Sequence, residues 1–368
     1  MKRFIALILS VFLLCGSLSV KGVSVSANAA VVIDGISGKI LYSLNSDKRL
    51  SMASTTKIMT ALLLCEQEDL SRTVTVTEEM IRVEGSSMGL TVGIKVTLRD
   101  LLYGMLLSSG NDAANAAAVA VGGSVKNFVA MMNKKAEALG LRNTHFDTPS
   151  GLDGLTHYTT AYELALLTNE ALKNNDFAAA AQTRSVTLDY GGIKHTLTNH
   201  NRLLSTYPDA VGVKTGFTKK SGRCLVSAAR RDGGLVIAVT LNDGNDWQDH
   251  KAMLDYGFSC LNESPLRFEA RSYTVRVLGG AENQVAAKSD EVAFRTAKGQ
   301  SVEEKIYLRP FISAPVAKGE LIGYIEYYCG TELVAKQNIT AVQSVEALPE
   351  IGLFDKFWIS FKKLLNYI

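Results

Sequence analysis

The stretch SMASTTKIMTALLL, residues 51–64, carries the pattern on which the fold and the chemistry of this chain depend. It is an apolar, helix-like run that nevertheless keeps a serine at position 54 and a lysine at position 57. Residues three apart share one face of a helix, so we expect the Lys57 amine to lie beside the Ser54 hydroxyl. Burial disfavours the ammonium form of a lysine, and a neutral amine can take the proton of an attacking serine. A serine at a helix N-cap, followed by a lysine that extends to solvent, would give the same pattern.

The segments around this run predict one antiparallel sheet covered by helices. Residues 29–45 contain two β-rich runs joined by a glycine-containing turn, which indicates a hairpin. A helix-rich region follows over about residues 54–174, with an expected helix cap at Ser124 and a capping box at Thr160. Strands return in GVKTGFT, RCLVSAAR and LVIAVTLN, and a last helix is expected over DWQDHKAMLDYGF. Because strands come from both ends and helices from between them, residues 28–264 are predicted to form an α+β domain.

The composition of the chain changes after about residue 265. Short alternating runs follow one another, separated by turn residues: SYTVRVLGG, EVAFRT, EKIYLR, LIGYIEYY and LVAKQNITAV. Alternation with a period of two indicates strands with one buried face, and several short strands of this kind are typical of a small sandwich. We therefore predict a separate all-β domain over residues 265–347, which contains no constellation of residues that could carry chemistry.

The two ends of the chain predict export and attachment to a membrane surface. Two basic residues precede an apolar run over residues 4–14, and small residues follow, which is typical of a signal peptide over residues 1–27. An uncleaved anchor is the alternative. Residues 350–368 place large apolar side chains on one helical stripe and lysines off it, which fits a helix that lies flat on a membrane; such a helix could instead pack on the protein's own core or on a partner. The expected location is the outer face of the cytoplasmic membrane or the cell-wall space.

Length and composition exclude several classes of protein. With 368 residues, of which 47% are hydrophobic and 20% charged, the chain can form two globular domains. The net charge of +3, without a run of basic residues, argues against a nucleic-acid partner. One of the five cysteines lies in the predicted signal and the others are scattered, while the five histidines show no ligand spacing. We therefore expect free thiols, no metal site and no cofactor.

Two further short motifs follow the serine–lysine pair. LLSSGNDAAN contains S-G-N at 109–111, after a helix-like run, and VGVKTGFT contains K-T-G at 214–216, in a strand-like run. They come in order, 55 residues after Ser54 (109 − 54) and then 105 residues further on (214 − 109). Together with S-x-x-K, this order resembles the signature of the penicillin-binding serine peptidases, and more narrowly that of the low-molecular-weight D-alanyl-D-alanine carboxypeptidases.

The resemblance covers essentially the whole mature chain. It extends through DAANAAAVAVGGS, NKKAEALGLRNTHFDTPSGL and NHNRLL, and then through the β-rich region and the amphipathic tail. It implies a β-lactamase/transpeptidase-like catalytic domain, in which helices flank an antiparallel sheet and a helical insert separates its strands. A small β-sandwich domain and the C-terminal amphipathic helix would follow.

The resemblance also implies which residues react. Ser54 would be the nucleophile that forms an acyl-enzyme, and Lys57 its general base. Ser109 would relay the proton to the leaving amine. The backbone N–H groups of Ser54 and Phe217 would form the oxyanion hole that stabilises the tetrahedral intermediate.

The remaining motif residues would bind the substrate. Asn111 would hold Lys57 and hydrogen-bond the substrate backbone. Lys214 would place a positive charge near the substrate carboxylate, to which Thr215 would donate a hydrogen bond. Gly216 would let the substrate lie along the strand edge, where a side chain would obstruct it.

The implied activity is removal of the terminal D-alanine from peptidoglycan stem peptides that end in D-Ala-D-Ala, with β-lactam antibiotics as covalent inhibitors acylating Ser54. Relatives often carry an arginine on the late helix as a second contact for the substrate carboxylate. Here Lys251 stands near the corresponding place, and a lysine cannot make the bidentate fork of an arginine. The basic residues Lys219, Lys220 and Arg223 could equally be solvated surface charges.

Two alternative functions fit parts of the sequence. A serine β-lactamase of the same fold needs fast deacylation, often by a glutamate-activated water, but no E-x-x-L-N-like segment lies between residues 109 and 214. The β-domain and the tail also fit a resident enzyme of the cell wall better. A catalytically silent wall-binding or scaffolding protein is the second alternative, and the intact motif residues argue against it.

Overall fold

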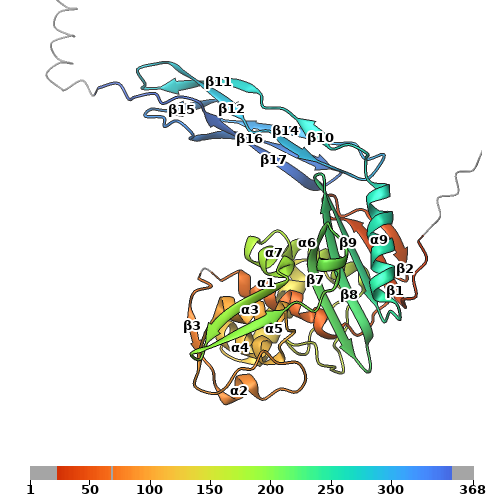
Figure 1. The fold of residues 1–368 in the computed structure, drawn as a ribbon. Helices are drawn as coiled ribbons and strands as arrows, with labels where there is room; N and C mark the ends of the chain where they lie inside the picture. The colour runs from red at the N-terminus through yellow and green to blue at the C-terminus, as the bar shows by residue number, and fades with distance from the viewer. Residues whose placement is uncertain (1–22, 68, 350–368) are drawn as a thin grey trace, which may run out of the picture.

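Two domains follow one another along the chain in the computed structural model, which describes residues 23–67 and 69–349. The N-terminal domain is built on a five-stranded antiparallel sheet. The C-terminal domain is an elongated β-structure that begins beside the end of helix α9 (Asp246–Cys260), as Figure 1 shows. The α+β fold predicted from the sequence is confirmed.

The first and last segments of the N-terminal domain share its sheet, as the sequence predicts. The strand order β2-β1-β9-β8-β7 pairs the N-terminal hairpin directly with the strands that close the domain. Ala29, Val31 and Ile33 of β1 pack with the helices on one face of the sheet. Ala30 and Val32 point to the other face and pack against α9. The strands are β1 (Ala29–Asp34), β2 (Ile40–Leu44), β7 (Ala210–Thr218), β8 (Gly222–Arg231) and β9 (Gly234–Leu241).

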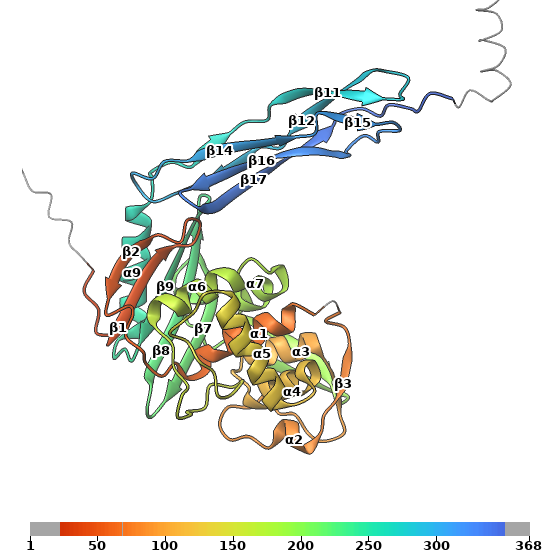
Figure 2. The ribbon, with the colours of Figure 1, turned by 180° about the vertical axis from the view of Figure 1, so that it is seen from behind.

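The helical region covers the face of the sheet opposite α9 (Figure 2). Helix α1 (Lys57–Cys65) lies at its centre and all of its residues are buried, which explains why the run SMASTTKIMTALLL is apolar on every side. Two short ribbons lie at its periphery. The remaining elements are the 3-10 turn η1 (Ala53–Thr56), the helices α2 (Glu78–Ile81), α3 (Leu98–Leu106), α4 (Asn111–Gly122), α5 (Val125–Ala138), α6 (Ala161–Ala171), α7 (Asn175–Gln182) and α8 (Leu203–Thr206), and the ribbon strands β3 (Thr73–Thr75), β4 (Lys95–Thr97), β5 (Ser185–Tyr190) and β6 (Ile193–Thr198).

The helix starts follow the sequence signals, with one difference. Ser124 caps α5, and the Thr160 hydroxyl caps α6 by accepting the backbone N–H of Glu163. The carboxylate of Glu163, however, does not return to the start of its own helix. It accepts the backbone N–H of Asn143 and the hydroxyl of Thr144 instead. The capping box expected at Thr160 is therefore only half formed, because a neighbouring loop supplies the donors for the glutamate.

The C-terminal domain is a six-stranded sheet with a two-stranded ribbon packed on it. The strand order in the sheet is β14-β16-β17-β12-β11-β15. Phe268 and Phe294 of the ribbon stack on each other and lie against Tyr327 of the sheet, at 4.1 and 6.0 Å between ring centroids. Strand β12 was not predicted, because its sequence QVAAKS is short and poor in the residues that favour strands. The strands are β10 (Leu266–Phe268), β11 (Ser272–Leu278), β12 (Gln284–Ser289), β13 (Val292–Phe294), β14 (Glu303–Leu308), β15 (Phe311–Ser313), β16 (Leu321–Cys329) and β17 (Glu332–Ala341).

The predicted signal peptide and the predicted membrane-associating helix fall mainly outside the described residues. Of the predicted signal, only residues 23–27 are described, and they run along the N-terminal domain. The backbone N–H of Ser26 donates to Asp249 at 2.6 Å, and its hydroxyl donates to Asp243 at 2.7 Å. The predicted helix over 350–368 lies outside the described part. Within residues 23–67 and 69–349, no helix combines the length and the apolar character needed to cross a membrane.

Candidate active site

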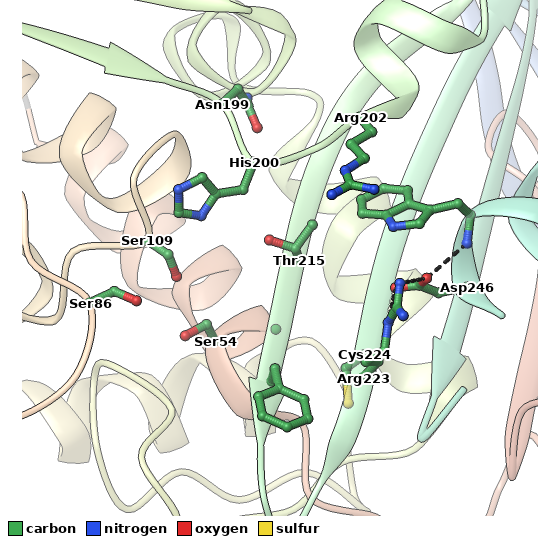
Figure 3. Close-up of a pocket in the computed structure, with 13 residues that line it drawn as sticks. Ser54, Ser86, Ser109, Asn199, His200, Arg202, Thr215, Arg223, Cys224 and Asp246 are labelled. Carbon is green, nitrogen blue, oxygen red and sulfur yellow. Dashed lines mark hydrogen bonds and ion pairs between the residues drawn. The ribbon is translucent and has the colours of Figure 1, made fainter. Parts of the chain in front are cut away.

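A cavity of about 760 Å³ opens beside the edge strand β7, between the helical region and the start of α9 (Figure 3). Segments far apart in the sequence form its walls. Of the predicted site residues, Ser54, Ser109 and residues 215–217 line the cavity, whereas Lys57, Asn111 and Lys214 are buried behind its wall. The lining residues are Ser54, Ser86, Ser109, Asn199, His200, Arg202, Thr215, Gly216, Phe217, Arg223, Cys224, Asp246 and Trp247.

The expected pairing of serine and lysine is present. Ser54 lies in the 3-10 turn η1, and Lys57 begins helix α1 directly after it. The Lys57 Nζ is 3.0 Å from the Ser54 Oγ, 2.7 Å from the Asn111 Oδ1 and 2.6 Å from the backbone oxygen of Ser150. Two of these three neighbours are carbonyl oxygens, which can only accept. In a neutral amine they fix both N–H bonds, so the lone pair is left to face the hydroxyl of Ser54.

The surroundings of Lys57 favour this neutral amine. The side chain is completely buried, and desolvation holds the pKa of Lys57 well below its usual value. The positive charge of Lys214 lowers this pKa further, whereas the carboxylate of Asp112 raises it. The alternative in which the lysine extends to solvent is therefore excluded by the structure.

Asn111 holds the amine in place from the first position of α4. Its amide Nδ2 donates to the backbone oxygen of Glu84 at 2.6 Å, which directs the amide oxygen to Lys57. The preceding turn between α3 and α4 places Ser109 in a left-handed conformation, with φ +59°. This turn brings the Ser109 hydroxyl to the cavity wall, where it faces the same space as Ser54 (Figure 3).

Lys214 is buried within strand β7, and its Nζ donates to the backbone oxygen of Thr215 at 2.9 Å. Desolvation lowers the pKa of Lys214 to about 7. Near neutral pH this lysine is therefore only partly protonated before a substrate arrives. A substrate carboxylate would favour the charged form, because an opposite charge nearby stabilises the ammonium.

The structure gives a second reason for a glycine at position 216, besides the one expected from the sequence. A Cβ at this position would lie 2.9 Å from the backbone nitrogen of Ser54 and 3.1 Å from the Cβ of Ala53. The glycine therefore lets β7 approach the nucleophile turn closely, besides leaving the strand edge open. Phe217, the next residue, also lines the cavity, and its side chain is exposed.

The structure changes the assignment of the basic residues. Lys251 does not line the cavity, although the sequence placed it near the second carboxylate contact. Arg223 does line it, but its guanidinium donates to both carboxylate oxygens of Asp246, through Nε at 3.1 Å and through Nη2. Arg202 lies over the ring of Trp247, with its Cζ 5.8 Å from the ring centroid. Within the described part of the chain, no acidic side chain forms an ion pair with Arg202.

Sequence reasoning missed His200, Arg202 and Trp247 as residues of this cavity. The segment NHNRLL contributed to the resemblance, but nothing in it indicated which side chains face the site. Trp247 stands in the first turn of α9, and its place beside Arg202 depends on how α9 packs on the sheet. The close-up in Figure 3 shows Arg202 on the far side of Thr215 from Ser54, and the ring of Trp247 lies beside its guanidinium.

Comparison with known protein families and relatives gives consistent results. A family model described as D-alanyl-D-alanine carboxypeptidase matches residues 17–245, and a model of the C-terminal domain of penicillin-binding protein 5 matches residues 268–347. The D-alanyl-D-alanine carboxypeptidase DacF of Bacillus subtilis is 33% identical, over 91% of this chain and 91% of that protein. DacC of Escherichia coli is 31% identical, over 92% of this chain and 88% of that protein.

Solved structures show the same similarity. The D-alanyl-D-alanine carboxypeptidase DacD from Francisella tularensis is 26% identical, with a TM-score of 0.63 over 89% of this chain and 95% of that one. The Streptomyces K15 DD-transpeptidase is 36% identical, with a TM-score of 0.63 over 65% of this chain and 100% of that one. The first comparison spans both domains, whereas the second covers about two thirds of this chain.

Proposed function

The chain belongs to the D-alanyl-D-alanine carboxypeptidase family and is a serine-type peptidase, and we propose that it removes the terminal D-alanine of peptidoglycan stem peptides through an acyl-enzyme on Ser54. One observation carries this mechanism. The Lys57 amine is buried, held by two carbonyl oxygens, and 3.0 Å from the Ser54 hydroxyl. This geometry makes the serine a nucleophile, because its proton has an acceptor already in place.

Acylation follows from this arrangement. Ser54 Oγ attacks the carbonyl carbon of the penultimate D-alanine while its proton passes to Lys57. The backbone N–H groups of Ser54 and Phe217 stabilise the oxyanion. When the C–N bond breaks, Ser109 relays the proton from Lys57 to the leaving amine, and D-alanine departs. The neutral amine can then activate a water molecule that hydrolyses the ester and restores Ser54.

The carboxylate of the leaving D-alanine binds to Thr215 and to two positively charged side chains, Lys214 and Arg202. Lys214 supplies one charge from β7, but its pKa of about 7 leaves it partly neutral in the free enzyme. We assign the second contact to Arg202, which takes the place that the sequence had suggested for Lys251. A guanidinium stays charged and can bind a carboxylate through two hydrogen bonds. Arg223 is less suited, because Asp246 already occupies its donors.

β-Lactams should acylate the same serine, because their strained amide presents a carbonyl to the same nucleophile. A β-lactamase would additionally need a carboxylate that activates water for fast deacylation. Asp246 is the one carboxylate among the lining residues, and it is paired with Arg223. This pairing supports a long-lived acyl-enzyme and argues against the β-lactamase alternative. The silent-protein alternative is opposed by the intact contacts of Lys57.

The location of the enzyme is also a proposal. The N-terminal pattern over residues 1–27 supports export, and the apolar stripe with lysines beside it over residues 350–368 supports attachment to a membrane surface. A peptidoglycan substrate requires a site outside the cytoplasmic membrane. Deleting residues 352–368 should release the enzyme from membranes and leave D-alanine release intact. Unchanged membrane retention of this truncated enzyme after removal of the signal would refute the anchor.

The decisive experiment uses the full-length enzyme and two measurements. The first is the intact mass after treatment with a penicillin, with the adduct mapped to a peptide. The second is D-alanine release from a synthetic peptide that ends in D-Ala-D-Ala. We expect one persistent adduct on the peptide containing Ser54, and D-alanine release that is abolished in Ser54→Ala. Rapid turnover of the adduct would indicate a β-lactamase, and D-alanine release by Ser54→Ala would refute the mechanism.

A further inference from the structure

The residue before the nucleophile has an unfavourable backbone conformation. Ala53 has φ +48°, in the left-handed region that side chains with a Cβ rarely adopt. This conformation sets the direction in which η1 presents Ser54, and with it the 3.0 Å distance to Lys57. Such a residue persists only where the surroundings fix it. The contacts that fix Ala53 therefore determine whether the nucleophile is placed correctly.

One chain of hydrogen bonds fixes this turn. The Thr56 hydroxyl donates to the backbone oxygen of Ala53 at 2.7 Å. The same hydroxyl oxygen is 2.7 Å from the Nε2 of His157. The Nδ1 of His157 accepts the backbone N–H of Asp147 at 2.9 Å, so the ring proton must be on Nε2. The imidazole therefore donates to the Thr56 hydroxyl, and the donor of each hydrogen bond in this series is determined.

The loop that carries His157 also contacts the general base. Its Ser150 provides one of the carbonyl oxygens that hold Lys57. Gly151 packs so closely on the turn that a Cβ there would lie 2.0 Å from the backbone oxygen of Ala53. His157 itself is 3% exposed and its ring meets Phe146 edge-on, with 5.9 Å between the centroids. The imidazole thus joins the loop behind Lys57 to the turn that carries Ser54.

We propose that His157 is a positioning residue for acylation, which orients Ser54 through Thr56 and the backbone oxygen of Ala53. The proposal rests on the function proposed above, since it concerns the rate at which Ser54 is acylated. His157 does not touch the substrate cavity and does not itself transfer a proton.

His157 can hold this position across the working range of the enzyme. Desolvation lowers the pKa of His157 to about 4, and the positive charges of His145 and Lys220 lower it further. The carboxylates of Asp147 and Asp153 raise this pKa, but they do not offset the desolvation. The neutral ring with its proton on Nε2 is therefore the form present near neutral pH. This is the form that can accept from Asp147 and donate to Thr56 at the same time.

Two substitutions test separately the two hydrogen bonds of His157, the one to Thr56 and the one from Asp147. In His157→Gln, the longer amide can place an N–H group near the position of Nε2 and keep the donor to Thr56. In His157→Asn, the shorter amide can place its oxygen near the position of Nδ1 and keep only the acceptor for Asp147. The measurement is the first-order rate constant of acylation by a fluorescent penicillin in the full-length enzyme, together with the melting temperature of each variant.

We expect the Asn variant to be acylated about tenfold more slowly than the Gln variant, which is the size of effect expected when one hydrogen bond that orients a reacting group is lost. The saturation constant for the penicillin and the melting temperature should be similar in the two variants. A purely structural histidine would instead give equal acylation rates at equal stability, and that result would overturn the proposal. A penicillin that acylates neither variant nor the wild type would count against the proposed function itself.

Thr56 provides a second test that remains valid if the His157 variants do not fold. Thr56→Val removes the hydroxyl that links the ring to the turn while keeping the side-chain shape, and Thr56→Ser keeps the hydroxyl. We expect slow acylation in the valine variant and recovery in the serine variant. If the Thr56→Val variant is acylated at the wild-type rate, the proposed role of His157 is refuted. D-alanine release by the wild type shows independently whether the enzyme itself is active.

Discussion

Replacing Arg202 by glutamine should weaken recognition of the substrate carboxylate. The Arg202 guanidinium lies at the cavity over Trp247 and has no acidic partner among the described residues, so its charge is available to a ligand. A hydrogen bond between charged groups contributes about 1.5–3 kcal/mol, and a fully exposed ion pair about 0.2–1 kcal/mol. Arg202 is exposed but lines a cavity, so a loss of about 1–2 kcal/mol is expected. This corresponds to about a 5- to 30-fold decrease in kcat/KM.

Arg223 is the matched control, because it lines the same cavity but is neutralised by Asp246. The assay compares kcat/KM for Arg202→Gln, Arg202→Lys and Arg223→Gln, with peptides that end in D-Ala-D-Ala as the free acid or as the amide. Arg202→Gln should raise KM for the free acid and reduce the preference for the acid by the same factor. Arg202→Lys should recover part of the loss, since it keeps the charge but not the fork. An equal loss in Arg223→Gln, or an unchanged preference in Arg202→Gln, would refute the assignment.

Three further predictions concern pH and packing. First, desolvation lowers the pKa of Lys214 to about 7, so kcat/KM should fall as the pH rises through 7 and Lys214 loses its positive charge. Lys214→Arg should remove this fall in kcat/KM, and a fall that stays would contradict this origin. Second, Gly216→Ala should slow acylation about 100-fold, because its Cβ would press on the Ser54 N–H of the oxyanion hole, and an acylation rate like the wild type's would exclude that contact. Third, burial lowers the pKa of His250 from 6.5 to about 3, so the unfolded chain binds this proton first as the pH falls, and His250 alone should lower the free energy of unfolding by about 1.6 kcal/mol between pH 6.5 and 5. Urea denaturation at both pH values should show a smaller decrease in His250→Asn, and an equal decrease would remove His250 as the cause.

The sequence predicts those parts of the site that depend on local patterns. Ser54 and Lys57 are three residues apart within a run that is apolar on every side, so both their proximity and the burial of the amine follow from the sequence. Asn111 and Lys214 belong to motifs whose order along the chain identified the family. For these residues, chain neighbours or a known motif carry the information.

The sequence does not predict contacts that depend on how distant segments pack. The second acceptor for Lys57 is the backbone oxygen of Ser150, and a backbone atom has no sequence signature. Arg202 and Arg223 are equivalent in the sequence, and only the structure shows that Asp246 neutralises one of them. The half-formed capping box at Thr160 has the same cause, since the donors for Glu163 come from a separate loop.

The distribution of backbone strain shows how the site is prepared before a substrate binds. Among the described residues, five non-glycine positions have a positive φ, and three of them are asparagine or aspartate, which tolerate this conformation in turns. The other two are Ala53, beside the nucleophile, and Ser109, the proposed proton relay. Such residues cost about 1–3 kcal/mol each and persist where packing and hydrogen bonds over-determine them. Ala53 and Ser109 both lie beside the Ser54–Lys57 pair. The packing and hydrogen bonds of the surrounding domain offset the cost of these two conformations and so maintain the positions of the nucleophile and the relay. Reacting groups that are already oriented need little reorganisation in the transition state, and this is how side chains fixed by the fold can open an amide bond.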